Sequence, residues 1–231
     1  MKRSICVFVA ALPGLVTLVP AAINISGFSS VVNDRFAVRS NPADFIADGV
    51  NLAPVAINDV ANYKWATMIS PNVFVAANHF DPEVGSSLTF YETNDANGPS
   101  ETRTVQQLQR MGTTDILLGV LNAPLPASYG YLPFYDQTAA QLFDDIFTNG
   151  TVNPLALLMG KSPTSSFPIQ QSMAVGQNVL DYNGYGVDTL GGATGQIVAA
   201  IVNEPGDSNL VPFEAHLQSF DSGAPLLMEV D

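Results

Sequence analysis

The sequence is poor in the residue types from which crosslinks and metal sites are built. It contains one cysteine, Cys6, and two histidines, His79 and His216, among 231 residues. A single cysteine excludes an intramolecular disulfide, and a zinc site made of cysteine and histidine would need more of both. We therefore expect no metal and no other cofactor, and any imidazole chemistry must use one of the two histidines.

Positive charge is also scarce. Eight Lys and Arg residues stand against 21 Asp and Glu, which gives a formal net charge of −13 at pH 7. Proteins that bind nucleic acid neutralise phosphates with clustered cations, so this balance argues against a nucleic-acid partner. Hydrophobic residues make up 47% of the chain and charged residues only 13%. That composition is typical of a globular protein and argues against disorder.

Long apolar runs are missing outside the first 22 residues. Lys2 and Arg3 precede the apolar run Ile5–Leu12, and small residues follow at Pro20-Ala21-Ala22. This pattern indicates a secretory signal peptide over residues 1–22. A membrane anchor is the less favoured alternative, because prolines and a glycine break the run and no later stretch reaches the ~18–20 apolar residues that cross a bilayer. We expect a bacterial secreted or periplasmic protein whose mature form is not in a membrane.

The remaining chain has the pattern of an all-β protein. Short runs rich in Val, Ile, Thr and aromatic residues alternate with clusters of Gly, Pro, Asn and Asp. Gly184 and Gly186 are expected in a turn rather than in a nucleotide-binding loop. One helix, Gln137–Asp145, is expected between two β halves. The predicted strands are Lys64–Ile69, Val73–Ala77, Ser87–Glu92, Thr102–Leu108, Asp115–Leu121, Pro154–Met159, Ser172–Leu180, Gly195–Asn203, Phe213–Leu217 and Pro225–Val230.

Three polar residues stand at places where a β scaffold could hold them for chemistry. His79 follows the predicted strand Val73–Ala77, Asp115 heads a strongly apolar stretch, and Ser222 lies in an Asp-Ser-Gly turn before the last predicted strand. Taken singly, each has an ordinary interpretation as a strand-end or turn residue. A carboxylate that heads an apolar strand needs a hydrogen-bond donor, however, and a histidine could supply it.

In the order His, Asp, Ser, these segments resemble the trypsin/chymotrypsin-like serine peptidases. The resemblance rests on Ala77-Asn78-His79, on Thr114-Asp115-Ile116-Leu117-Leu118 and, most specifically, on Asp221-Ser222-Gly223-Ala224-Pro225-Leu226. It covers residues 50–231. Phe220 and Ala224 stand where that family usually has glycine. The resemblance implies a double antiparallel Greek-key β-barrel, with a signal peptide at 1–22, an N-terminal extension at 23–49, a first barrel at 50–135 and a second at 136–231.

The resemblance also implies a role for each site residue. Ser222 is the expected nucleophile, His79 its general base, and Asp115 the carboxylate that orients the imidazole. The backbone N–H groups of Phe220 and Ser222 are the expected oxyanion hole. Asp221 is expected to support the loop by pairing with a buried ammonium or another donor.

His216 is a candidate for the specificity pocket, because it lies six positions before Ser222, where the family has its primary specificity residue. It has an equally simple interpretation as a plain strand residue. Relatives of that family continue well beyond the point that corresponds to Asp231, so we expect the second barrel to be incomplete and the chain to be a fragment, with a degenerate open barrel as the alternative.

The sequence thus predicts a secreted serine endopeptidase that hydrolyses polypeptide substrates through an acyl-enzyme. The alternative is a catalytically inactive trypsin-like fold that serves as a secreted binding or scaffold protein. The sequence carries no signal for the oligomeric state.

Overall fold

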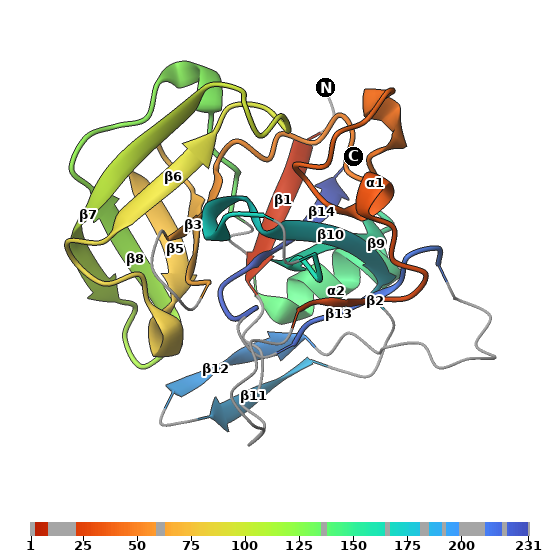
Figure 1. The fold of residues 1–231 in the computed structure, drawn as a ribbon. Coiled ribbons are helices and arrows are strands. Elements are labelled where there is room, and N and C mark those ends of the chain that lie inside the picture. Colours follow the sequence, from red (N-terminus) through yellow and green to blue (C-terminus); the bar gives the residue numbers. More distant parts are fainter. Residues whose placement is uncertain are drawn as a thin grey trace.

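A computed structural model describes residues 3–8, 22–58, 63–134, 138–164, 167–180, 185–190, 193–198, 211–218 and 221–230 of the chain. The predicted all-β fold class is confirmed, and the chain contains a closed six-stranded antiparallel barrel (Figure 1). The barrel strands are β3 (Val55–Asn58), β4 (Trp65–Met68), β5 (Val73–Ala77), β6 (Ser87–Tyr91), β7 (Ser100–Arg110) and β8 (Ile116–Leu121). They pair in the order β3-β4-β5-β8-β7-β6, and β6 closes the barrel on β3.

Outside the barrel, the second half of the chain joins two N-terminal strands to form an open sheet of four strands in the order β1-β14-β9-β10 and two small sheets, β11-β12 and β13-β2. Its strands are β1 (Arg3–Phe8), β2 (Asn24–Ile25), β9 (Val152–Lys161), β10 (Met173–Val179), β11 (Tyr185–Leu190), β12 (Ala193–Val198), β13 (Ala215–His216) and β14 (Pro225–Val230). The helical elements are α1 (Ser30–Asn33), α2 (Ala139–Phe147) and the 3-10 turns η1 (Pro42–Asp44), η2 (Asn78–Phe80), η3 (Ala127–Tyr129) and η4 (Ile169–Gln171).

The predicted elements match the structure best where an apolar run follows a clear turn signal or where a helix has a capping pattern. β5 and β14 have the predicted bounds, and α2 begins at a capping box formed by Thr138 and Gln141. The expectation of a turn is wrong for Gly186, which lies in β11, while Gly184 is outside the described residues. The predicted strand Gly195–Asn203 overlaps β12 up to Val198, and its remainder lies outside the described residues.

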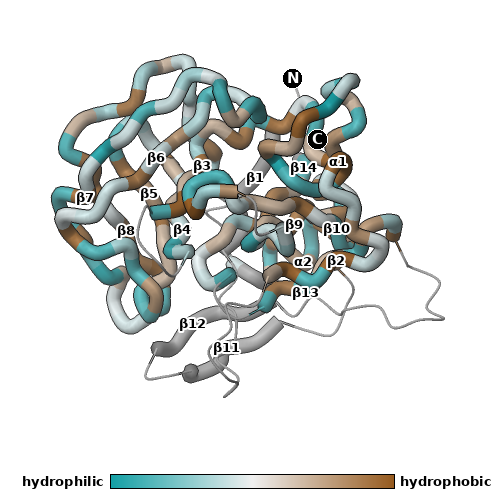
Figure 2. Tube along the Cα trace, viewed as in Figure 1, coloured by the Kyte–Doolittle hydropathy of each residue, from teal (hydrophilic) through white to brown (hydrophobic). Residues whose placement is uncertain are grey.

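The barrel interior is filled by alternating side chains of its strands. Along β8, buried and half-buried residues alternate. Most residues of the neighbouring strand β7 are hydrophilic (Figure 2). Phe74 of β5 lies directly opposite Gly119 of β8, and its ring occupies the space where a Cβ on residue 119 would lie, 1.9 Å from Phe74 Cζ. Glycine at 119 therefore allows the aromatic ring to lie flat across the strand pair that leads to the candidate site.

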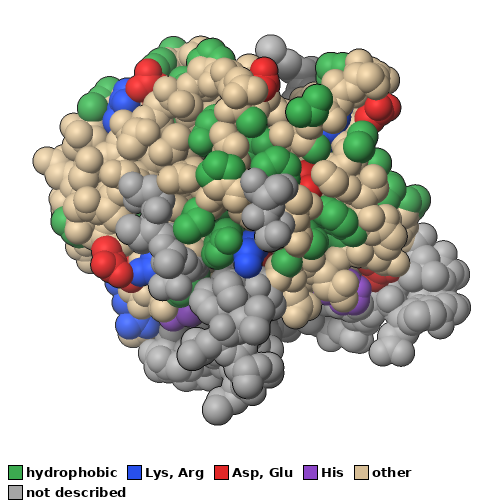
Figure 3. Space-filling view, in the orientation of Figure 1, with side chains coloured by type: hydrophobic (Ala, Val, Ile, Leu, Met, Phe, Trp, Pro, Cys, Tyr) green, Lys and Arg blue, Asp and Glu red, His purple; other side chains and the backbone are tan. Residues whose placement is uncertain are grey.

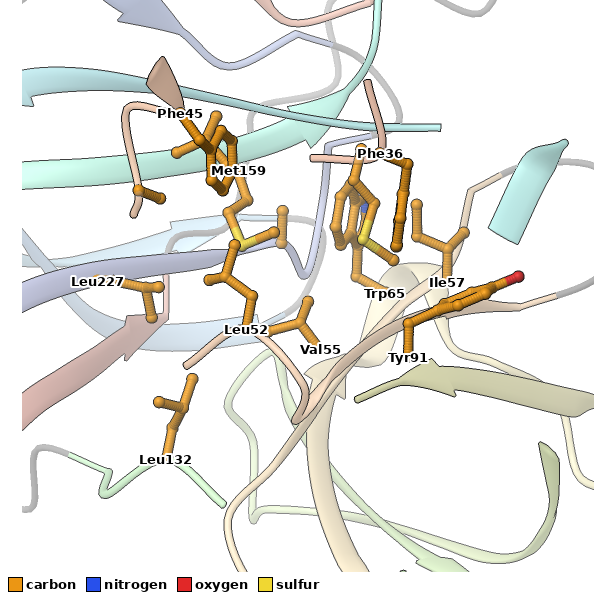
Figure 4. Packing of buried hydrophobic residues seen from close by; sticks show 14 residues of the cluster. Phe36, Phe45, Leu52, Val55, Ile57, Trp65, Tyr91, Leu132, Met159 and Leu227 are labelled. Carbon is orange, nitrogen blue, oxygen red and sulfur yellow. The ribbon is translucent and has the colours of Figure 1, made fainter. Parts of the chain in front are cut away.

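A shared hydrophobic cluster joins the barrel to the second half. Ile57, Trp65 and Tyr91 come from barrel strands and meet Met159 of β9 and Leu227 of β14 (Figure 4). The centre of this cluster is fully buried, since Trp65 and Met159 are 0% exposed. The two halves therefore bury a common core rather than meeting through a solvated surface.

The predicted N-terminal extension supplies a buried cation to this junction. Arg35 is 0% exposed and donates hydrogen bonds to the carbonyls of Val55 (3.3 Å) and Tyr91 (2.9 Å) and to Asn94 Oδ1 (3.1 Å). Desolvation by burial lowers the pKa of Arg35 to about 9. The guanidinium of Arg35 links β3 and β6 to the N-terminal extension. The backbone N–H of Arg35 donates to the carbonyl of Met173 on β10 (3.0 Å).

Replacing Gly119 by alanine should lower the free energy of unfolding by about 1–3 kcal/mol, because the new methyl group would overlap the Phe74 ring. Urea unfolding of Gly119→Ala measures the loss. The matched control adds Gly119→Ala to Phe74→Leu, where the smaller side chain leaves room for the methyl group. We expect the second loss to be clearly smaller, and equal losses in both backgrounds would contradict the contact.

Candidate functional site

The pairing of β5 with β8 brings His79 and Asp115 to the same end of the barrel. The last register pair is Ala77 with Ile116, so the next residue of each strand, Asn78 and Asp115, continues the ladder. The backbone N–H of Asn78 donates to the carbonyl of Asp115 (2.7 Å). β5 ends at Ala77, and His79 lies in the 3-10 turn η2 that follows directly.

Both oxygens of the Asp115 carboxylate bind the same residue. The His79 backbone N–H donates to Oδ1 (2.9 Å), and His79 Nδ1 lies 2.5 Å from Oδ2. A carboxylate only accepts hydrogen bonds, so Nδ1 carries the proton, and Nε2 of a neutral ring is left as an acceptor. The side chain of His79 is 37% exposed and that of Asp115 20% exposed. The imidazole is thus fixed at one edge and open at the other.

Asp115 remains ionised in this position. Burial by itself would raise the pKa of the Asp115 carboxyl, but the two hydrogen bonds from His79, the charge of His79 and that of Arg110 together lower the pKa below its ordinary value. Arg110 is held nearby because its Nε donates to the carbonyl of Thr114 (2.7 Å). An ionised carboxylate against Nδ1 stabilises a positive charge on the ring.

Ser222 reaches the open edge of the imidazole from the other half of the molecule. Its Oγ lies 2.9 Å from His79 Nε2, and the residue is only 7% exposed. The chain turns at Ser222-Gly223, where Gly223 has φ of 88°, a conformation that favours glycine. The backbone N–H of Ala224 donates to the carbonyl of Asp221 (3.0 Å) and closes the turn before β14 begins.

Asp221 fixes this turn through hydrogen bonds to its carboxylate. It is 0% exposed, and its Oδ1 accepts from the backbone N–H of Lys161 (2.7 Å) while its Oδ2 accepts from that of Gln218 (2.8 Å). The hydrogen bonds that the described residues make to this carboxylate therefore come from main-chain donors, where the family resemblance led us to expect a buried ammonium or another donor. Desolvation by burial raises the pKa of Asp221 to about 7, although both backbone hydrogen bonds and the charge of Lys161 act in the opposite direction.

Gly160 gives the Asp221 carboxylate its space, and sequence reasoning missed this role. A Cβ on residue 160 would lie 2.7 Å from Asp221 Oδ1 and 2.7 Å from Cβ of Ile23. The backbone donors of Lys161 and Gln218 were missed too, because a main-chain N–H leaves no trace in the residue type. The end of β9 thus provides both the space, at Gly160, and a hydrogen-bond donor, at Lys161, for the Asp221 carboxylate.

The remaining predicted site residues lie elsewhere or outside the described part. Phe220 is outside the described residues. His216 lies on β13 opposite Asn24, and its Nε2 is 3.9 Å from Oε1 of the buried Glu214. The described contacts of His216 therefore involve the β2-β13 sheet and not the group formed by His79, Asp115 and Ser222.

Three further findings concern the described residues only. No group of three or more His, Cys, Asp or Glu side chains among them is arranged to hold a metal ion. None of their helices is long and apolar enough to span a membrane. On the face shown in Figure 3, Lys and Arg side chains are scattered among acidic ones and form no continuous patch.

The arrangement defines a chain of hydrogen bonds from carboxylate to imidazole to hydroxyl. With Nδ1 protonated and held by Asp115, Nε2 is positioned to accept the Ser222 hydroxyl proton at 2.9 Å. A hydroxyl in contact with such a base is activated toward attack on an electrophilic carbon. The chemistry that the site can perform is nucleophilic substitution at an acyl centre or an equivalent electrophile.

Asp221 should make the stability of the protein depend on pH. Its folded pKa of about 7 lies above the ordinary aspartate value of 3.8, so the carboxyl favours folding most below about pH 4, and this contribution is lost as the pH rises through 7. The full difference is about 4 kcal/mol for a shift of this size. Asp221→Asn removes the titration, so we expect its unfolding free energy to rise relative to the wild type between pH 4 and pH 7.

Urea unfolding of both proteins across this pH range measures the effect. Glu229→Gln at the far end of β14 is the matched control for loss of one carboxyl, and we expect it to follow the wild-type curve. A constant difference between wild type and Asp221→Asn over the range would show that Asp221 titrates normally.

Comparison of the chain with protein-family models and with curated proteins finds no match in either set. The distances among His79, Asp115 and Ser222 are therefore the basis on which a function is assigned.

Proposed function

We propose that this protein is a serine endopeptidase in which Ser222, His79 and Asp115 act as nucleophile, general base and orienting carboxylate. The observation that carries the proposal is the continuous contact from Asp115 Oδ2 to His79 Nδ1 (2.5 Å) and from His79 Nε2 to Ser222 Oγ (2.9 Å). A hydrogen bond between nucleophile and base, with the base oriented by a third group, is the arrangement that such catalysis requires.

The reaction begins with proton transfer. As Ser222 Oγ attacks the carbonyl carbon of a peptide bond, its proton moves to Nε2 of His79. Asp115 stabilises the resulting imidazolium without taking the proton itself. His79 then gives the proton to the leaving amine, the C–N bond breaks, and an acyl group stays on Ser222 as an ester. Water activated by His79 hydrolyses that ester and restores the free hydroxyl.

When Ser222 attacks, negative charge develops on the carbonyl oxygen of the substrate, and hydrogen-bond donors close to Ser222 must stabilise it. The backbone N–H of Ser222 is one candidate, since none of the described residues accepts a hydrogen bond from it. The N–H of Phe220 is the second candidate on grounds of family resemblance. Each such donor is worth about 2.7–4 kcal/mol in comparable enzymes. The anchoring of Asp221 by Lys161 and Gln218 supports this assignment, because it fixes the turn that carries the donors.

The finer description of the fold belongs to the same proposal. A closed antiparallel barrel that carries His79 and Asp115, followed by a second β unit that carries Ser222, supports a trypsin-like double barrel with Greek-key connections. The second unit is an open sheet over the described residues. Export under the direction of residues 1–22, and polypeptides as the substrate class, complete the proposal.

Labelling with a fluorophosphonate probe tests the nucleophile. The probe should form a covalent adduct with Ser222, and Ser222→Ala should abolish the adduct. His79→Ala should slow labelling by about 10³-fold or more, because the base is lost. Ser100→Ala, an exposed hydroxyl at the start of β7, is the control and should label like the wild type. Wild-type protein that does not label would favour the inactive binding or scaffold protein.

Asp115→Asn tests the orienting role separately. An amide presents a donor as well as an acceptor, so it cannot accept from both the backbone N–H and Nδ1 of His79. We expect peptide hydrolysis to fall by about 10⁴-fold while Ser222 and His79 stay in place. Kinetics on a casein substrate measure the loss, and circular dichroism checks that the variant is folded. A variant with wild-type hydrolysis would exclude Asp115 from the mechanism.

A further inference from the structure

Strand β14, which follows the Ser222 turn, has a partner on each side. On one side it pairs with β9, with Leu226 opposite Leu158 and Leu227 opposite Leu157. On the other side it pairs antiparallel with β1 over the full length of both strands, from Pro225 opposite Phe8 to Val230 opposite Arg3. Figure 1 shows the two strands side by side. β1 is the outermost strand of the sheet.

Both faces of β14 are buried. Leu227 (2% exposed) belongs to the cluster shared with the barrel (Figure 4), while Leu226 and Met228 (3% and 2% exposed) belong to the cluster that α2 covers through Leu142 and Ile146. A strand with two apolar faces is typical of the interior of a sheet. At an outer edge it would present unpaired backbone groups beside apolar side chains, which invites strand addition.

We propose that the outer edge of β14 is an acceptor site for an extended apolar strand, and that residues Arg3–Phe8 of the same chain occupy it. The occupant fits this site in composition: Ile5, Val7 and Phe8 are residues that favour strands, the segment contains no proline, and its charge is at the end, at Arg3. Recognition is by the antiparallel backbone ladder, with apolar side chains as the selective element.

This inference goes beyond the proposed peptidase activity and links it to processing. The residues that occupy the edge lie within the predicted signal peptide, so removal of that segment would end this pairing with β14. β14 begins at Pro225, three positions after Ser222, and the Asp221 anchor is bonded to Lys161 at the end of β9. Occupation of the edge therefore orders the sheet from which the Ser222 turn departs.

The pairing register gives a direct test in the full chain. Residues directly opposite in an antiparallel pair have Cα atoms about 4.5–5.5 Å apart, within the range that a disulfide bridges. In a Cys6→Ser background, Ser4→Cys with Glu229→Cys places two cysteines at register partners. The matched control is Ser4→Cys with Val230→Cys, whose second cysteine is one residue out of register and on the opposite face. Mass spectrometry after mild oxidation detects the intramolecular crosslink.

We expect the in-register pair to crosslink about tenfold faster than the control, or more. Hydrogen exchange gives a second measurement. In the wild-type chain, the backbone amides of Leu226–Val230 should be protected on both edges of β14. In a variant with Ile5→Pro and Val7→Pro, the amides that face β1 should lose this protection. Equal crosslinking of both pairs, or unchanged exchange in the proline variant, would overturn the proposal. Neither measurement depends on peptidase activity.

Discussion

The pairing of β5 with β8 is the constraint on which the candidate site depends. It places Asn78 and Asp115 opposite one another, and both oxygens of the Asp115 carboxylate then accept hydrogen bonds from His79. The backbone bond fixes where the residue sits, and the bond to Nδ1 fixes which ring nitrogen carries the proton. Because Phe74 lies across Gly119 in the same strand pair, the ladder below the site is tightly filled. The register between β5 and β8 therefore determines the orientation of His79.

The serine side of the site depends on a different kind of support. Asp221 is buried, and the main-chain N–H groups of Lys161 and Gln218 donate to its carboxylate. This arrangement balances desolvation against hydrogen bonding, which is why its pKa is about 7. His79 and Ser222 come into contact because the two halves of the molecule share a hydrophobic core. Arg35 adds to this by hydrogen-bonding β3 and β6 to the N-terminal extension. A 2.9 Å contact between His79 and Ser222 thus spans the junction of the two halves.

Sequence reasoning succeeded where residue type and local pattern carry the information. The grouping of His79, Asp115 and Ser222 could be predicted because each follows or precedes a recognisable strand, and β5 and β14 have clear apolar runs with turn signals at their starts. It missed β3, since Val55–Asn58 is short, buried on both faces and so lacks alternation. Arg35, Gly160 and the main-chain donors to Asp221 could not be foreseen, because their contacts join segments distant in the chain. The pairing of β1 with β14 was hidden by the signal-like pattern of the same residues.

The central claim is that His79 makes Ser222 a nucleophile. The most direct measurement is the acylation of the full chain by p-nitrophenyl acetate, followed by mass spectrometry of the peptide that contains Ser222. The account predicts a burst of nitrophenol equivalent to one acetyl group per chain, located on Ser222 and lost in His79→Ala. An acetyl group absent from Ser222, or formed at the same rate without His79, would contradict it.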